Sequence, residues 1–493
     1  MNDAKTCPGG AAPVTKLRPV AIILGTAMLA GCAAGPDFKP PAPPDVQKYT
    51  AAALPAQTLS TPGKMGDAQR FVMQLPIGPA WWQQFGSPKL DTLVSSALRS
   101  SPTLVAARAI LREAKEAYAA QAGSTLYPQV AAQLGAQRQT VTPAAQGLTG
   151  AERTFNLYNT SVGVSYNLDL SGTNRRALEA LAAQADYQRF QLEGARLTLA
   201  ANVVTTAITQ AQLAGQIAAT EKILDAQSAQ LAIARQRLAL GNVSEADVLP
   251  LQTQVEQTRA TLMPLRNHLE QTDHLLAILV GQPPGSAATQ QFTLTDFRLP
   301  AELPLRVPSE LVHRRPDILA SEALLHAASA QRGVAVSRLY PQLTLSANAG
   351  FQALTTASLF GPNSVVWGLA GQLAQPLFNA GLRPTARAAA AGFDAAAANY
   401  QQTVLQALRN VADVLRAVDN DAQALQAQAT ADGSAQRSLE LTQQQYDLGA
   451  ASYLQLLIAQ QQAQQTRIGL IAAQALRLAD TAALYEAMGG GQL

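Results

Sequence analysis

Proline is missing from two long windows of this sequence, residues 144–249 and 385–493. Because proline breaks or kinks the interior of a helix, such windows are where long helices can form. Alanine and glutamine dominate the stretches 175–240 and 385–448 inside these windows, and alanine has the highest helix propensity. At about 1.5 Å of rise per residue, each stretch would span roughly 100 Å as a single helix.

The second stretch also carries a heptad rhythm. Apolar residues recur there at alternating spacings of three and four, namely Leu408, Val411, Leu415, Val418, Ala422 and Leu425. This spacing provides a seam for left-handed supercoiling. Aromatic residues make up only 5% of the chain, which favours thinly packed long helices over ordinary globular domains. A soluble coiled coil would show the same seam, so the helices alone leave that alternative open.

Both long stretches end in the same way, at a glycine followed three residues later by a serine. The pairs are Gly241 with Ser244, and Gly449 with Ser452. Glycine readily takes the left-handed conformation just past a helix end, and serine is a favoured N-cap for the next helix. We therefore expect two helical hairpins with these residues at their tips.

The returning helices are expected over 245–280 and 453–488. Asp247 and Gln455 stand three residues after the capping serines, which is the position where a capping box closes. Pro264 lies inside the first returning helix and is expected to kink or break it.

The hairpins are part of an internal repeat. The tetrapeptide Leu-Tyr-Pro-Gln occurs at 126–129 and again at 339–342. Each half reads as helix, strands, long helix, glycine turn and returning helix, as repeat architectures do when one unit is duplicated. The expected organisation is a leader, an extended N-terminal segment, a first repeat, a second repeat and a tail, over residues 1–31, 32–85, 86–290, 291–488 and 489–493.

Each repeat contains two segments with strict alternation of apolar and polar residues. We expect strands over about 128–139 and 154–170 in the first repeat, and 341–353 and 364–378 in the second. Period-2 alternation indicates strands with one apolar and one polar face. Strands of about ten residues with this pattern are typical of membrane β-barrels. A small soluble antiparallel sheet is the alternative.

The number of strands determines how such a barrel could be built. One chain supplies four strands, whereas membrane barrels of this kind need at least about eight, because open sheet edges are not tolerated in lipid. Several copies would therefore have to share one barrel. The expected fold class is mainly α, with a β-barrel portion built jointly by several chains.

The N-terminus has the layout of a secretory leader. Lys16 and Arg18 precede ten uncharged residues, 20–29, and the small residues Ala30 and Gly31 follow. This is the pattern of a signal peptide, and its apolar run is too short to span a membrane. The string Leu-Ala-Gly-Cys resembles a bacterial lipobox, which implies that Cys32 is acylated and becomes the first mature residue. An ordinary buried or free thiol is the alternative.

Composition gives little support to other functions. Removal of residues 1–31 would lower the formal net charge from +3 to +1, since three basic side chains and one acidic side chain are lost. That balance gives no electrostatic case for nucleic acid as a partner. Phosphate-loop, nucleophile-elbow and zincin motifs are absent from the sequence. We therefore expect no enzyme activity, no metal site and no cofactor apart from a covalent lipid on Cys32.

With these features in place, the sequence resembles the outer-membrane efflux proteins, the TolC-like outer-membrane factors, and within them the lipid-anchored branch. The resemblance covers nearly all of the mature chain. It is carried by the order and spacing of several short motifs: Cys32 with Gly35-Pro36-Asp37-Phe38, Trp81-Trp82 with Phe85, the two Leu-Tyr-Pro-Gln elements, Leu168-Asp169-Leu170, Arg314-Arg315-Pro316-Asp317, Gln375-Pro376-Leu377-Phe378 and Met488-Gly489-Gly490-Gly491.

The resemblance implies a homotrimer in the outer membrane. Three chains would form a 12-stranded barrel that continues as an α-helical barrel in the periplasm. This duct would passively export small molecules, in partnership with a periplasmic adaptor and an inner-membrane transporter. Selection of the substrate is expected in the transporter. The alternatives are a closed coiled-coil spacer lipoprotein without a pore, and an enzyme carried on a helical scaffold.

The resemblance also places a gate and a docking surface at the hairpin tips. Related proteins often carry an apolar residue followed four positions later by Asp, and the matching positions here are Leu454 and Ile458. The acidic member is absent, so Asp247 near the first tip is the remaining acidic candidate, although it also suits a helix cap. Both an apolar and an acidic gate stay open. The residues that shape the tips, Gly241, Ser244, Gly449 and Ser452, are the candidates for adaptor contact.

Overall fold

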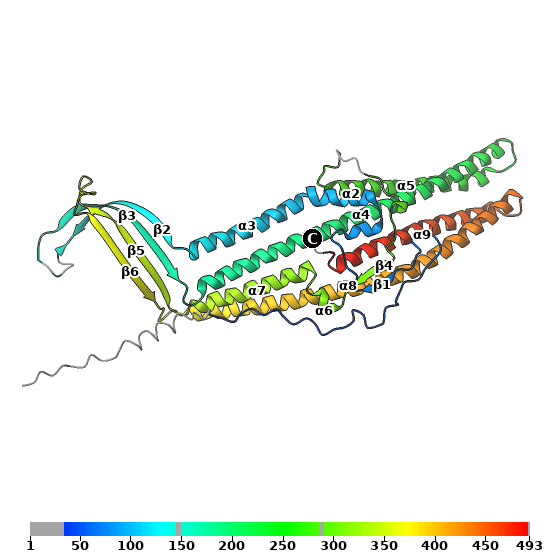
Figure 1. Cartoon of the computed structure of the whole chain (residues 1–493). Helices are drawn as coiled ribbons and strands as arrows, with labels where there is room; N and C mark the ends of the chain where they lie inside the picture. The colour runs from blue at the N-terminus through cyan, green and yellow to red at the C-terminus, as the bar shows by residue number, and fades with distance from the viewer. Residues whose placement is uncertain (1–33, 144–146, 148, 286–289, 492–493) are drawn as a thin grey trace, which may run out of the picture. The chain divides into compact units, whose positions relative to one another are not determined.

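The computed structural model describes residues 34–143, 147, 149–285 and 290–491 (Figure 1). In chain order its elements are β1 (Arg70–Met73), η1 (Trp81–Phe85), α2 (Pro88–Ser100), α3 (Pro102–Thr125), β2 (Gln129–Val141), β3 (Arg153–Leu168), α4 (Thr173–Ala239), α5 (Glu245–Leu279), η3 (Leu294–Asp296), β4 (Glu302–Leu305), α6 (Pro308–Leu311), α7 (Pro316–Ser337), β5 (Gln342–Ala353), β6 (Val365–Ala374), α8 (Leu382–Asp447) and α9 (Tyr453–Ala487). The expected repeat of helix, two strands, long helix and returning helix is confirmed in both halves.

The described residues fall into two compact units. The first holds the four-stranded sheet and the helix ends next to it, residues 34–39, 116–183 and 326–395. The second holds most of the helical residues, 40–115, 184–325 and 396–491. Helices α3, α4, α7 and α8 contribute residues to both units. None of the helices formed by the described residues is both long and apolar enough to cross a membrane.

The sheet of the first unit is antiparallel, with the strand order β2-β3-β5-β6 (Figure 1). Its central pair, β3 with β5, joins the two repeats. Val164 lies opposite Val130 on one side and Ala347 on the other, so the apolar positions of neighbouring strands share one face. The sequence prediction of strands with one apolar face is therefore confirmed.

Many of these apolar side chains are exposed in the single chain. Leu134, Trp367 and Leu369 show 85%, 78% and 79% of their surface to solvent. The last strand was predicted to reach residue 378 but ends at Ala374. Pro376 follows closely, and proline cannot donate a backbone hydrogen bond to a ladder.

Four long helices dominate the chain. Helices α4 and α8 contain 67 and 66 residues, and α5 and α9 contain 35 each. The predicted heptad seam of α8 is buried at Val411, Leu415, Val418, Ala422 and Leu425, each at most 1% exposed. The helices and the seam expected from the sequence are thus confirmed.

Pro264 was expected to kink or break the first returning helix. The expectation of a break was wrong, because α5 runs without interruption from Glu245 to Leu279, and the kink stays a prediction. Pro264 and Ala260, whose carbonyl loses its helical partner, are both exposed. Water can therefore replace the missing hydrogen bond. On the other side of the same turn, Leu262 is only 2% exposed, and its burial holds the helix in place.

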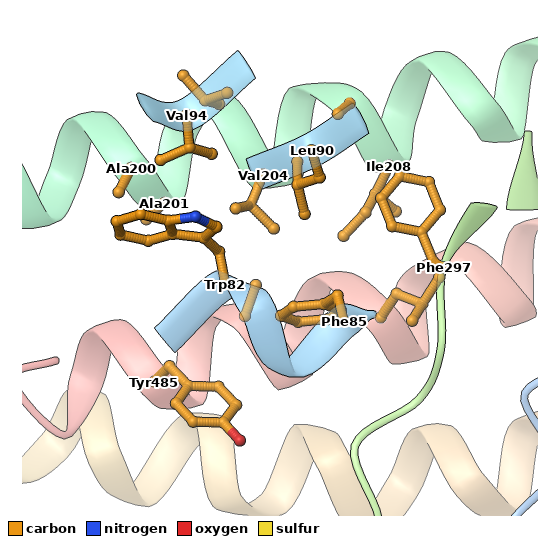
Figure 2. Packing of buried hydrophobic residues seen from close by; sticks show 14 of the residues in the cluster. Trp82, Phe85, Leu90, Val94, Ala200, Ala201, Val204, Ile208, Phe297 and Tyr485 are labelled. Atoms are coloured by element: carbon orange, nitrogen blue, oxygen red, sulfur yellow. The ribbon is translucent and has the colours of Figure 1, made fainter. Parts of the chain in front are cut away.

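Both halves of the chain contribute to the main apolar core of the second unit. In Figure 2, Trp82 and Phe85 of η1 lie between Val204 and Ile208 of α4 and Tyr485 of α9. Trp81, beside them in η1, stacks on the Tyr485 ring at 5.5 Å between centroids. The short aromatic motif Trp81-Trp82 with Phe85 therefore ties the N-terminal region to helices from both repeats.

The N-terminal segment, expected to be extended, is held against other parts of the chain. Strand β1 pairs in parallel with β4 of the second repeat. Arg477 of α9, only 1% exposed, donates hydrogen bonds to the carbonyls of Met65 and Asp67 and to Thr58 Oγ1. Extended segments can be held firmly when buried donors meet their carbonyls in this way.

Candidate functional site

The tip of the first hairpin is a complete Schellman motif. Helix α4 ends there with the Asn242 N–H donating to the Arg237 carbonyl, and the Gly241 N–H donating to the Leu238 carbonyl, both at 2.9 Å. Gly241 has φ of +76°, a conformation that costs an L side chain about 1–2 kcal/mol. The glycine predicted to shape this tip does so through its backbone.

The second tip has the same construction. The Ala450 N–H donates to the Gln445 carbonyl at 2.8 Å, and the Gly449 N–H donates to the Tyr446 carbonyl at 2.9 Å. Gly449 has φ of +76° as well. A Cβ added at either glycine would meet no atom within 4 Å, so only the backbone angle demands glycine.

Both returning helices begin with a capping serine that donates to the side chain three residues later. The Ser244 N–H donates to Asp247 Oδ2 at 2.9 Å, and its hydroxyl donates to the same oxygen at 2.7 Å. Ser452 makes the same two contacts with Gln455 Oε1, at 2.7 and 3.0 Å. The hydrogen bond from the Ser244 hydroxyl, followed by that from its backbone, holds the pKa of Asp247 below its usual value. Asp247 thus serves as a helix cap through its Oδ2 atom in the single chain.

The apolar gate candidates lie just after the second tip. Leu454 and Ile458 are 63% and 57% exposed, and four residues apart on α9 they lie on the same helix face. Leu456 between them is completely buried. Large exposed aliphatic side chains of this kind are available for contact with another chain.

Near the tips, glutamine amides link the two hairpins. Gln230 of α4 donates to Gln443 of α8 at 3.1 Å and accepts from Gln460 of α9 at 2.9 Å. Gln461 of α9 donates to Gln254 of α5 at 3.1 Å. The sequence shows these glutamines only as helix formers, because spacing along one helix does not reveal which residue faces another helix.

A cavity of about 740 Å³ lies beside these amides, between α4, α8 and α9. Small side chains of α4, such as Ala219 and Ala226, line one wall, and Arg467 of α9 lines another. Gln227 is 2% exposed, and neither of its amide atoms has a hydrogen-bond partner within the described part of the chain. The contact between the hairpins is therefore loosely packed and polar here.

The sheet is the second part of the candidate site. Strands β2 and β6 lie at its ends, and within the described residues each has a strand neighbour on one side only. Opposite the apolar face, the same register aligns polar residues, for example Gln129 with Ser165 and Ser165 with Ser346. A sheet with one apolar face, one polar face and two open edges can be completed by further strands. Cys32, the predicted acylation site, lies outside the described residues.

The known proteins that are similar in sequence to this chain are outer-membrane efflux proteins. The profile of the family described as outer membrane efflux protein matches residues 93–282 and 307–490. The pyoverdine export outer membrane protein OpmQ of Pseudomonas putida is 30% identical over 452 residues, covering 89% of this chain and 95% of OpmQ. The solvent efflux pump outer membrane protein SrpC, also of Pseudomonas putida, is 29% identical, covering 94% of this chain and 96% of SrpC.

Solved structures share the fold. The outer-membrane channel OprN superposes with a TM-score of 0.83 at 25% identity, covering 93% of this chain and 99% of OprN. The outer membrane protein VceC of Vibrio cholerae gives a TM-score of 0.77 at 27% identity, covering 84% of this chain and 99% of VceC.

Proposed function

This chain belongs to the outer membrane efflux protein family, and we propose that three copies of it form the export duct of a tripartite pump. It is an outer-membrane efflux channel, as its relatives are, and the alternative of a pore-free spacer is set aside. The proposal also includes the number of chains, the partners, the gate, the anchor and the absence of catalysis.

The open four-stranded sheet carries the proposal. Its apolar face suits lipid and its polar face suits an aqueous lumen, but its two edges need partners before it can enter a membrane. Three identical sheets give 12 strands, which satisfies the minimum of about eight and the rule that closed rotational symmetry is usual in homo-oligomers.

The helices would supply the periplasmic part of the duct. Helices α4 and α8, each about 100 Å long at 1.5 Å per residue, are joined to the sheet strands by short connections after Leu168 and Ala374. The lumen would carry solute passively, since a channel needs a pore and a gate rather than a bond-making group.

For the gate, we favour the apolar candidates. Leu454 and Ile458 are exposed on one face of α9, and three copies near an axis would make an apolar ring that closes by dewetting. Asp247 is engaged with Ser244, which supports its role as a helix cap.

The hairpin tips are proposed as the surface that meets the periplasmic adaptor. Gly241 with Ser244, and Gly449 with Ser452, give two tips of the same backbone geometry per chain. An adaptor that recognises one tip could therefore recognise the other. The inner-membrane transporter would deliver solute through that adaptor.

The anchor is proposed at Cys32, where the lipobox-like string ends. Several acyl chains on one cysteine would give stable attachment to a membrane surface. The exported solute is proposed to be small molecules in general, because the names of the relatives refer to cargoes as different as pyoverdine, toluene and cations.

The deciding experiment combines native mass measurement with single-channel recording. The purified full-length protein in detergent should give a particle of three chains, and the same preparation should give discrete conductance steps in a planar bilayer. A monodisperse folded monomer, or a trimer that never conducts, would contradict the proposal.

A further inference from the structure

The motif Gly35-Pro36-Asp37-Phe38 contributes to the family resemblance, yet the export function gives it no role. In the structure, this motif lies against helices α4 and α7 of the first unit. These helices belong to different repeats, so the contact brings together three parts of the chain that are distant in sequence.

Arg176, near the start of α4, is the centre of this contact. Its side chain is only 6% exposed, and its guanidinium donates to the carbonyls of Ala34 and Gly35 at 3.4 and 3.3 Å. The same group pairs with Asp37 Oδ1 at 2.7 Å and with Glu179 Oε2 at 2.6 Å. A buried arginine with two carboxylate partners and two carbonyl partners is well satisfied.

The second half of the contact comes from α7. The His326 ring stacks on Phe38, with centroids 4.4 Å apart and planes inclined by 11°, and His326 Nε2 lies 2.8 Å from Glu179 Oε1. Burial alone would raise the pKa of Glu179, but hydrogen bonds from Arg176 and His326 outweigh it and keep that pKa below its usual value.

Two glycines allow the backbones to approach closely. Gly35 has φ of +89°, and a Cβ there would lie 2.9 Å from Gly333 Cα. A Cβ on Gly333 of α7 would lie 2.9 Å from Arg176 Cγ and 3.2 Å from the Ala34 oxygen. Gly333 is in the interior of α7, where alanine would normally be preferred. Its presence there fits the need for space beside residue 34.

We propose that Arg176, Glu179, His326 and Gly333 form an acceptor site for the first residues of the mature chain, which we name the N-terminal clasp. The Ala34 N–H also donates to the Ser171 carbonyl at 2.8 Å, between the end of β3 and the start of α4. Ala34 is two positions after Cys32 in the sequence, and two steps along the chain span at most about 7 Å. The clasp therefore fixes the lipid anchor beside the strand ends, so that anchor and sheet share one membrane boundary. This inference rests on the proposed acylation of Cys32.

The test uses the full-length lipoprotein with the substitution Lys39→Cys, which places a thiol directly after Phe38. Cys7 leaves with the leader and an acylated Cys32 does not react, so one thiol per chain should accept a nitroxide spin label. In reconstituted vesicles the label should show restricted motion and one immersion depth, measured by electron paramagnetic resonance with oxygen and a nickel chelate as relaxants.

Three variants in this background separate the clasp from general stability. Arg176→Ala should raise the mobile fraction of the label at least twofold and broaden its depth. Gly333→Ala should do the same, even though it improves the helix propensity of α7. Arg189→Ala removes an exposed arginine from the same helix, α4, and should leave the spectrum unchanged. Preserved conductance of each variant shows that the channel is folded.

Equal mobility and depth in the parent, Arg176→Ala and Gly333→Ala would overturn the clasp. Two labels per chain would overturn the acylation of Cys32 and with it the anchoring role, while the mobility of the variants would still report on the contact itself.

Discussion

Val164 of β3 lies directly opposite Ala347 of β5. The next residue, Ser165, lies opposite Ser346. Since successive residues on a strand point to opposite faces, one step along β3 moves from the apolar face of the sheet to the polar face. This pair of positions separates the surface proposed to contact lipid from the surface proposed to contact water.

Val164→Asp should therefore impair membrane insertion, whereas Ser165→Asp should be mild. Near the membrane midplane, a carboxylate on the lipid face destabilises a barrel by up to about 2 kcal/mol. A trimer would contain three such carboxylates, one from each chain. The amount of folded trimer in outer membranes should fall at least tenfold for Val164→Asp and less than twofold for Ser165→Asp. The measurement is a semi-native gel of membrane fractions. Equal loss in both variants would mean that the two faces are not lipid and lumen.

The gate prediction compares Ile458→Asp with Asp247→Asn. Three aspartates near an axis, at separations of roughly 8 Å and an effective dielectric of about 20, would repel by about 2 kcal/mol per pair before screening. Ile458→Asp should therefore raise the open probability in single-channel recordings, and the effect should weaken at high salt. Asp247→Asn should do less, because it weakens only a cap.

The recordings should be made for wild type and both variants at low and high salt. If Asp247→Asn alone opens the channel and Ile458→Asp changes nothing, the gate is an acidic ring and the apolar assignment fails.

Two glycines allow a matched pair of substitutions, one in the second tip just after α8 and one within α8. Gly449 has φ of +76°, so Gly449→Ala should destabilise the tip by about 1–2 kcal/mol. Gly433 lies within α8 with open space around its Cβ position, so Gly433→Ala should stabilise the helix by roughly 0.5–1 kcal/mol. Hydrogen exchange of the tip peptide should become faster in the first variant and not in the second. The reverse order would contradict the Schellman geometry.

A carboxyl pair between α8 and α9 predicts a dependence of stability on pH. Burial, followed by the hydrogen bond and the charge of Asp480, raises the pKa of Asp421 to about 7. The folded state therefore holds a proton that the unfolded state releases from about pH 4 upward. The free energy of unfolding should fall as pH rises from about 4 through 7, and then level off.

Asp421→Asn removes this contribution, so the variant should gain stability relative to wild type as pH rises from 5 to 8. Allowing for solvent screening of a half-exposed group, the gain should be no more than about 2 kcal/mol. Thermal unfolding of the detergent-solubilised protein at several pH values measures it. The control is Asp413→Asn, which alters an exposed ion pair on the same helix. Its stability should differ from that of wild type by the same amount at every pH tested. If the stability difference between Asp421→Asn and wild type were also independent of pH, the Asp421–Asp480 pair would not be the cause of the pH dependence.

The anchor prediction concerns Cys32→Ser. The substitution should abolish acylation, while some barrel still inserts because the apolar face of its sheet binds lipid on its own. Intact mass of the mature wild-type chain should exceed the mass of residues 32–493 by that of the acyl groups. An unmodified cysteine in wild type would end the lipoprotein assignment.

Regular elements could be predicted from the sequence because their patterns are local. The alternation in β3, the glycine tips and the seam of α8 each lie within a few turns or residues, and the structure confirms them. The expected break at Pro264 was wrong because the effect of a proline inside a helix depends on whether its surroundings are exposed to water. A lost backbone hydrogen bond is tolerated where water can reach the free carbonyl, and no local pattern reveals that.

Contacts between distant parts of the chain could not be predicted in this way. The pairing of β1 with β4 joins Arg70 to Glu302, and nothing in either four-residue strand specifies its partner. The same holds for Arg176, which reads as one of several charged residues at the start of a helix until the fold brings Asp37 beside it. Glutamines such as Gln230 have amides that match many partners equally well.

The open edges of the sheet also bear on gene dosage. Strands β2 and β6 find their missing neighbours only when other chains arrive, so the stability of the proposed barrel belongs to three chains jointly and depends on their concentration. Where unassembled chains predominate, halving their supply would lower the number of finished channels about eightfold, because a trimer forms with the third power of the chain concentration. A modest fall in synthesis would then act as a steep switch on export capacity.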